Sequence, residues 1–164
     1  MERTLVIIRH AKAINAEGDV KDFDRALTDS GKVDAEKMGK LLKEKSITPD
    51  LILCSPAKRT KQTAKRIAEQ TGYEADKIQY EDVLYPCNGP EITDLLRKCD
   101  NSVRVVFVVA HNPGIAGYAS YLDHTIDIRE VPPCCVVGVK FTVARWTDYP
   151  VEERKVFLYQ YPTK

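Results

Sequence analysis

Residues 103–110 read VRVVFVVA, and the polar run HNPG follows directly at residues 111–114. Near-continuous apolar sequence is typical of a strand that is covered on both faces, since a strand with one wet face alternates apolar and polar residues. Proline and glycine then interrupt the strand, and the apolar spacing over residues 115–122 is that of a helix. The stretch therefore predicts the central strand of a sheet that has helices on both sides.

The preceding chain alternates between strand-like and helix-like segments. Short apolar runs predict strands at residues 4–8 and 51–54, and a further short strand is expected at residues 77–81. Helical spacing, with Thr28 as an N-cap and Gly72 as a C-cap, predicts helices at about residues 28–45, 60–71 and 90–99.

Two further segments complete the predicted fold. Residues 11–27 are polar and lack a period, which indicates a long loop. Residues 134–143 and 155–161 are strand-like with only a turn between them, which predicts an antiparallel hairpin. The expected fold class is α/β: a three-layer sandwich whose mixed, mostly parallel sheet carries a C-terminal antiparallel hairpin.

Length and charge limit the class of protein. A chain of 164 residues has the size of one domain, so we expect residues 1–164 to form a single unit. The 25 Lys and Arg nearly balance the 24 Asp and Glu, which argues against a nucleic-acid-binding face. The longest apolar run has six residues, against the ~20 that span a membrane, and the N-terminus lacks a signal-peptide layout. We expect a soluble, cytoplasmic protein that binds neither nucleic acid nor membrane.

The five cysteines predict neither a disulfide framework nor a zinc site. Their number is odd, their spacing is irregular, and no C-x-x-C motif occurs. The adjacent Cys134 and Cys135 could form a redox device, but two strand residues that face opposite sides explain them better. A reducing cytoplasm fits this usage.

Charged and nucleophilic residues stand directly after the predicted core strands. Arg9 and His10 follow the first strand, Ser55 and then Arg59 follow the second, and His111 follows the central strand. In open α/β sheets, ligands bind outside the carboxyl ends of the strands, so these side chains should converge. These positions offer no carboxylate or thiolate at the spacing that metal ligands require. We therefore expect an anion site that uses no metal and no other cofactor.

Two arginines and two histidines at one point suit a phosphoryl group. Guanidinium forks match phosphoryl oxygens and keep their charge at any accessible pH. Nearby fixed cations lower the pKa of a histidine and keep its ring neutral and nucleophilic. Attack of such a ring on phosphorus forms a phosphohistidine, which water then hydrolyses.

Four motifs in series support this chemistry. They are LVIIRHA at 5–11, DRALTDSG at 24–31, SPAKRTKQTA at 55–64 and VVAHNP at 108–113. In this order they resemble the histidine phosphatase (phosphoglycerate mutase-like) superfamily, especially its small SixA-type phosphohistidine phosphatase branch. The resemblance implies that His10 becomes phosphorylated and that Arg9, Arg59 and His111 bind the phosphoryl group. It also implies that Arg25 reaches the pocket.

The expected substrate follows from the lack of a clear general acid, the group that would protonate the leaving group. Larger members of that family carry a carboxylic general acid on an inserted segment, for which this chain is too short. Glu81 and Asp82 are the candidates, and solvated loop carboxylates describe them better. Release of imidazole depends less on a proton donor than release of an alkoxide. The expected substrate is therefore a phosphorylated protein of the histidine phosphotransfer type.

Two alternatives stay open from sequence alone. The first is a small-molecule phosphomonoesterase of the same superfamily that acts on a small phosphorylated substrate. The second is a non-catalytic module that binds phosphate or a phosphoprotein. The nucleophile His10 argues against the second alternative, because binding alone does not require it.

Overall fold

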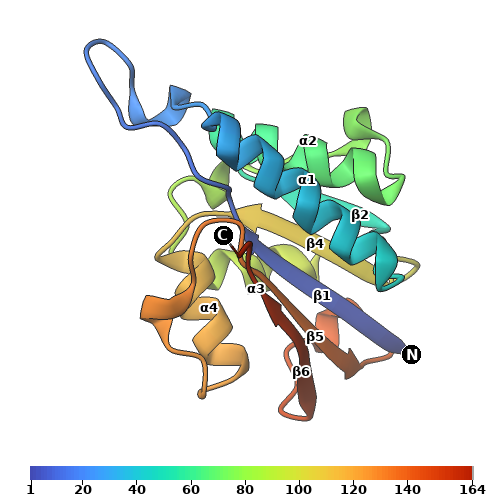
Figure 1. The fold of residues 1–164 in the computed structure, drawn as a ribbon. Helices are drawn as coiled ribbons and strands as arrows, with labels where there is room; N and C mark the ends of the chain where they lie inside the picture. Colours follow the sequence, from blue (N-terminus) through green and yellow to red (C-terminus); the bar gives the residue numbers. More distant parts are fainter. Residues whose placement is uncertain (164) are drawn as a thin grey trace.

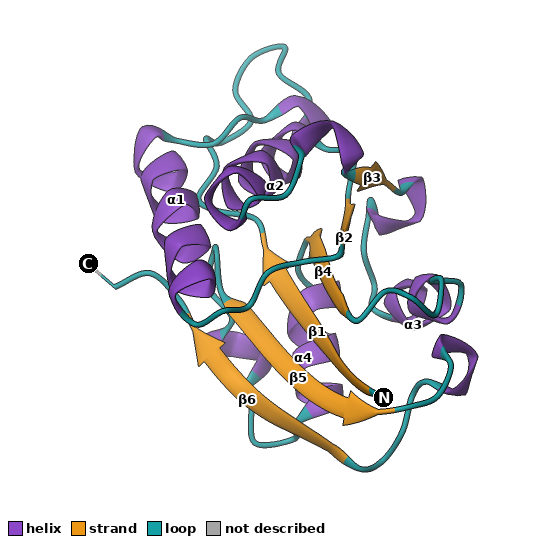
Figure 2. Ribbon diagram, turned by 90° about the vertical axis from the view of Figure 1, so that its right-hand side faces the viewer, coloured by secondary structure: helices purple, strands orange, loops and turns teal. Residues whose placement is uncertain are grey.

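A computed structural model describes residues 1–163, which contain a six-stranded sheet between two pairs of helices (Figures 1 and 2). The strands are β1 (Glu2–Arg9), β2 (Leu51–Cys54), β3 (Gln79–Tyr80), β4 (Val105–Ala110), β5 (Val136–Thr142) and β6 (Arg154–Gln160). The α-helices are α1 (Asp29–Glu44), α2 (Lys58–Thr71), α3 (Pro90–Arg97) and α4 (Gly114–Leu122). The predicted three-layer α/β class is confirmed.

The strands lie in the order β3-β2-β4-β1-β5-β6. β1 and β2 both pair in parallel with β4, and β3 pairs in parallel with β2. β5 is antiparallel to both β1 and β6. The sheet is therefore mixed and mostly parallel, with the predicted C-terminal hairpin attached to the edge of the parallel part.

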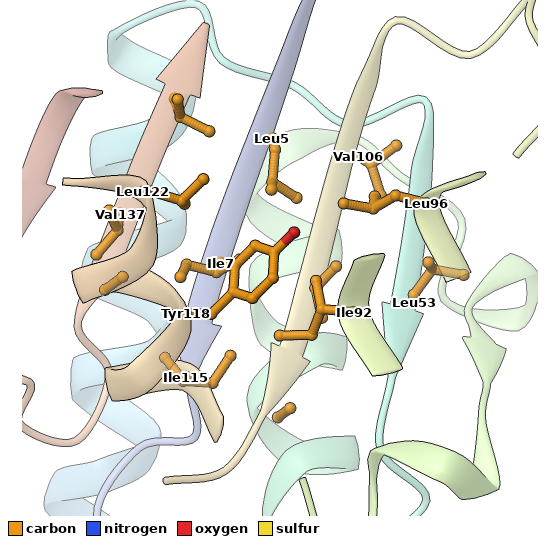
Figure 3. Close-up of a cluster of buried hydrophobic side chains, with 14 of the residues drawn as sticks. Leu5, Ile7, Leu53, Ile92, Leu96, Val106, Ile115, Tyr118, Leu122 and Val137 are labelled. Carbon is orange, nitrogen blue, oxygen red and sulfur yellow. The ribbon is translucent and has the colours of Figure 1, made fainter. Parts of the chain in front are cut away.

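Two hydrophobic cores lie on opposite faces of the sheet because successive strand residues point to opposite sides. In β1, Leu5 and Ile7 pack with α3 and α4, in the core that Figure 3 shows. Val6 and Ile8 pack with α1 and α2 in the second core. Full burial of an aliphatic side chain of this size contributes about 1.5–3 kcal/mol, so both faces of β1 anchor it firmly. The predicted burial of the central strands on both faces is confirmed.

The helix ends follow local sequence signals. The side chain of Thr28 accepts a hydrogen bond from the backbone N–H of Gly31 at 3.0 Å and so caps α1. Gly72 ends α2 with a φ of +79°, a conformation that favours glycine. Pro90 is the first residue of α3, where its missing N–H costs nothing. These predicted boundaries are confirmed.

The longest α-helix, α1, has 16 residues and buries a stripe that includes Ala35, Met38 and Leu42 against the sheet. Within residues 1–163, no helix combines the length and apolarity that a bilayer crossing requires.

A long loop joins β1 to α1 and projects past the helices in Figure 1, where it is blue. A bridge between Ala13 and Leu27 closes its base. A short 3-10 helix, η1 (Asp22–Asp24), lies farther along it. The predicted loop at residues 11–27 is confirmed, whereas η1 was not predicted because three residues show no periodicity.

The placement of Cys134 and Cys135 in a strand is wrong. β5 begins at Val136, and Cys134 has a φ of +63°, so the chain turns here before the strand starts. Both side chains are buried, Cys134 in the core beside α1 and α2 and Cys135 in the core beside α3 and α4. The expectation that they face opposite sides is therefore confirmed, and all five cysteines are free.

Candidate active site

The carboxyl ends of three parallel strands form the floor of a cavity of about 410 Å³. The register places Arg9 of β1 beside Ala110 of β4, and Cys54 of β2 beside Val109. Residues that follow these strands therefore meet at one edge of the sheet. The cavity is lined by Arg9, His10, Asp22, Arg25, Arg59, Tyr85, Pro86, Cys87, His111 and Asn112. All five residues predicted for the site are among them.

His10 is held in one tautomer. Its Nδ1 lies 2.7 Å from the backbone oxygen of Ala11, and a carbonyl oxygen only accepts, so Nδ1 carries the proton. In the neutral ring the lone pair is then on Nε2. Burial, together with the charges of Arg59 and Arg9, lowers the pKa of His10 to about 4, although the hydrogen bond to Ala11 opposes the shift. Near neutral pH this ring is therefore an uncharged nucleophile.

His111 faces His10 across the cavity floor, with ring centroids 5.3 Å apart. Its Nε2 lies 2.7 Å from Oγ of Ser55, the residue that follows β2, and this contact fixes the ring. Burial and then the charge of Arg59 lower the pKa of His111 to about 3. Its Nδ1 is buried without a protein partner among the described residues, which leaves a polar atom for a ligand.

The lowered pKa values of the two histidines predict a pH dependence of stability. In the unfolded chain both rings take up protons near pH ~6.5, whereas in the folded protein they stay neutral to about pH 4. The unfolded state thus binds more protons, and the free energy of unfolding falls as the pH drops from 7 to 5. Urea denaturation should show this slope, and His111→Asn should reduce it. NMR titration of His10 with a midpoint at pH 6 or above would contradict the assignment.

Arg59 and Arg9 carry fixed positive charge into the cavity. Arg59 lies in the first turn of α2 and is only 4% exposed, so it is not one of the solvated cations of that helix. Its Nη1 and Nη2 donate to Asp22, and Nη1 of Arg9 donates to the backbone oxygen of Val131. The Nε atoms of both arginines are buried without a partner among the described residues. Each guanidinium has five N–H donors, of which these contacts use two in Arg59 and one in Arg9, so both groups keep donors for an anion.

Arg25 reaches the cavity wall from the loop. Its Nε donates to Oδ1 of Asp22 at 3.0 Å, and its Nη1 donates to the backbone oxygen of Ile14 at 2.9 Å. Partial burial alone would raise the pKa of Asp22, but the hydrogen bond from Tyr85 and the charge of Arg59 lower it to about 2. The carboxylate is therefore ionised at neutral pH.

Sequence reasoning missed Asp22 and Tyr85. Asp22 stands in a polar loop among other acidic residues, and its one sequence signal is the spacing of three residues to Arg25. The ring of Tyr85 meets that of His111 edge-on at 5.4 Å, a contact between segments far apart in the chain. Glu81 and Asp82, the weak candidates for a general acid, are not among the residues that line the cavity.

The charges of the cavity suit an anion. Among residues 1–163, no three His, Cys, Asp or Glu side chains gather as metal ligands do. The cavity instead collects three arginines, two neutral histidines and one ionised carboxylate. The net positive charge of the arginines fits a phosphoryl group, whose oxygens accept hydrogen bonds from guanidinium N–H groups.

Comparison with known proteins places this chain in a family. Residues 5–85, which carry all but one of the five predicted site residues, match the model of the histidine phosphatase superfamily (branch 1). An uncharacterised protein of Mycobacterium tuberculosis is 30% identical over 149 residues, 86% of this chain and 90% of the relative. An uncharacterised chloroplastic protein of Arabidopsis thaliana is 26% identical over 131 residues, 75% of this chain. The chain spans only 60% of that plant relative.

A solved structure from Nakamurella multipartitia agrees with the match. It is provisionally named phosphohistidine phosphatase SixA and is 30% identical to this chain. It superimposes with a TM-score of 0.82 over 100% of this chain and 98% of its own. The family-model match and this structural similarity show that the chain belongs to the histidine phosphatase superfamily and is of the SixA type.

Proposed function

We propose that the protein is a metal-independent phosphatase that removes phosphate from protein phosphohistidine through a covalent intermediate on His10. The observation that carries the proposal is the Nδ1 contact of His10 with Ala11, which leaves the lone pair on Nε2 of a ring that lines the same cavity as the arginines. Nε2 attacks phosphorus and a P–N bond forms, while the P–N bond of the substrate breaks. Its electron pair stays on the substrate ring, which carries a proton on its other nitrogen and so leaves as neutral imidazole. Water then attacks phosphorus, which releases inorganic phosphate and restores the neutral ring.

The arginines supply the charge that this reaction needs. Phosphoryl transfer spreads negative charge over the three equatorial oxygens, and fixed cations stabilise it. Arg9 and Arg59 each keep a buried Nε–H without a partner among the described residues. His111 offers its unpartnered Nδ1 at the same floor. These groups take the place that a divalent metal has in other phosphatases.

The lining of the cavity supports phosphohistidine as the substrate. Asp22 is the carboxylic acid of that lining, and with a pKa of about 2 it holds no proton to give to a leaving group. An alkoxide needs such a proton, whereas imidazole leaves as a modest base. Tyr85, Pro86 and Cys87 also line the cavity. We further propose a reducing, cytoplasmic setting, because all five cysteines are free.

Substrate choice tests the proposal. We expect kcat/KM for a phosphorylated histidine phosphotransfer protein to exceed that for alkyl phosphates by more than about tenfold, because no acid protonates an alkoxide here. Glu81→Gln and Asp82→Asn should leave turnover of phosphohistidine nearly unchanged, since neither residue lines the cavity. Equal or reversed preference, with a large effect of Glu81→Gln, would instead support a small-molecule phosphomonoesterase. Phosphate binding without any turnover would support a binding module.

A further inference from the structure

Asp22 contacts three side chains that line the cavity. Its Oδ1 accepts a hydrogen bond from Nε of Arg25 at 3.0 Å and lies 3.0 Å from Nη2 of the same residue. Its Oδ2 accepts from Nη2 of Arg59 at 3.1 Å and from the hydroxyl of Tyr85 at 2.8 Å. Its backbone oxygen accepts from Nη1 of Arg59 at 2.6 Å. One residue thus joins the loop to α2 and to the segment before α3.

These contacts use only part of the Arg59 guanidinium. The group has five N–H donors, and Asp22 accepts from two of them, one on each Nη. The buried Nε–H has no partner among residues 1–163. Asp22 therefore orients Arg59 without occupying its remaining donors. Arg59 is buried and the Asp22 side chain is 52% exposed, so an exposed loop residue sets the direction of a buried cation.

The same contacts hold the loop against the cavity. At its base, the backbone N–H of Leu27 donates to Oε1 of Gln62 at 2.7 Å. Farther out, Asp22 and the ring of Phe23, which meets the ring of Tyr85 edge-on at 5.0 Å, connect the loop to the rest of the protein. An arginine side chain has several rotatable bonds, and fixing it beforehand reduces the entropy lost when an anion binds.

We propose that Asp22 is a positioning residue that aligns Arg59 for the phosphoryl group. The inference rests on the proposed function, because that function gives Arg59 its phosphoryl ligand. The competing view is that the Asp22 carboxylate is a rival anion, which a phosphoryl group must displace. The count of donors favours positioning: Asp22 accepts from two of the five N–H donors of Arg59, and Arg59 lines the cavity, so Arg59 can bind Asp22 and an anion together.

Asp22→Asn tests this role, because the amide nearly preserves size but removes the charge that holds Arg59. We expect KM for the phosphoprotein and the inhibition constant of orthovanadate to rise by about tenfold or more, with a smaller fall in kcat. Asp148→Asn is the matched control: Asp148 pairs with Arg145 at the same spacing of three residues, outside the cavity, and its loss should change neither value. Urea midpoints check that both variants fold.

A double-mutant cycle shows whether Asp22 acts through Arg59. On an Arg59→Lys background, Asp22→Asn should weaken orthovanadate binding far less than it does in the wild type. Tighter or unchanged orthovanadate binding in Asp22→Asn, or fully additive losses in the cycle, would overturn the proposal. Orthovanadate reports anion binding independently of the substrate. If the wild type fails to hydrolyse phosphohistidine while the cycle is non-additive, the proposed function fails and the positioning role stands.

Discussion

His10→Ala is expected to abolish turnover, with a loss in kcat of more than roughly 10³-fold, because the variant lacks the atom that attacks phosphorus. The ring borders an open cavity, so its removal should cost little stability. Single-turnover measurements with a phosphohistidine protein would give the rate. Acid-labile ³²P trapped on the wild-type chain, and absent from the variant, would identify the intermediate.

His124→Ala is the matched control for that experiment. His124 is an exposed histidine outside the cavity, so its loss should leave kcat and the trapped label unchanged. A His10→Ala variant that keeps more than a few per cent of the wild-type kcat would rule out the covalent route. The phosphate would then have to pass directly to water, with the arginines as its binding site.

Arg59→Ala is expected to reduce both catalysis and anion binding by about 10- to 100-fold, because each charge-assisted hydrogen bond contributes about 1.5–3 kcal/mol. The loss should appear in kcat/KM and also in the inhibition constants of orthovanadate and phosphate. Isothermal titration with orthovanadate would measure binding without turnover. Lys65→Ala removes an exposed cation of the same helix and serves as the control for net charge. Unchanged phosphate inhibition in Arg59→Ala would exclude a role in binding.

Much of the fold follows from local sequence. The continuous apolar run of β4 and the helical spacing and caps of α1 and α2 depend on neighbouring residues, so they could be predicted. Arg9, His10 and His111 could be placed together because parallel strands bring their carboxyl ends to one edge. Arg59 could be added because it lies in the first turn of the helix that follows β2.

The remaining features depend on contacts between distant residues. The hydroxyl of Tyr85 donates a hydrogen bond to Asp22, which is 63 positions away in the sequence. Neither residue lies in a periodic segment, so no local pattern indicates the pair. β3 contains two residues, too few to show alternation. The turn at Cys134 requires a left-handed backbone at a residue that rarely adopts one. In each case contacts between distant residues determine the local structure, and the sequence pattern around the residue is too short to predict it.

The order of the strands also bears on aggregation. Without β5, the eight-residue strand β1 would expose an apolar, unpaired backbone edge, which is a template for another chain. The hairpin moves that edge outward to β6, which begins with Arg154 and Lys155, and β3 closes the other side with only two residues. Charged and very short edge strands disfavour edge-to-edge association. The C-terminal hairpin therefore shields from self-assembly the strand that ends beside the proposed nucleophile.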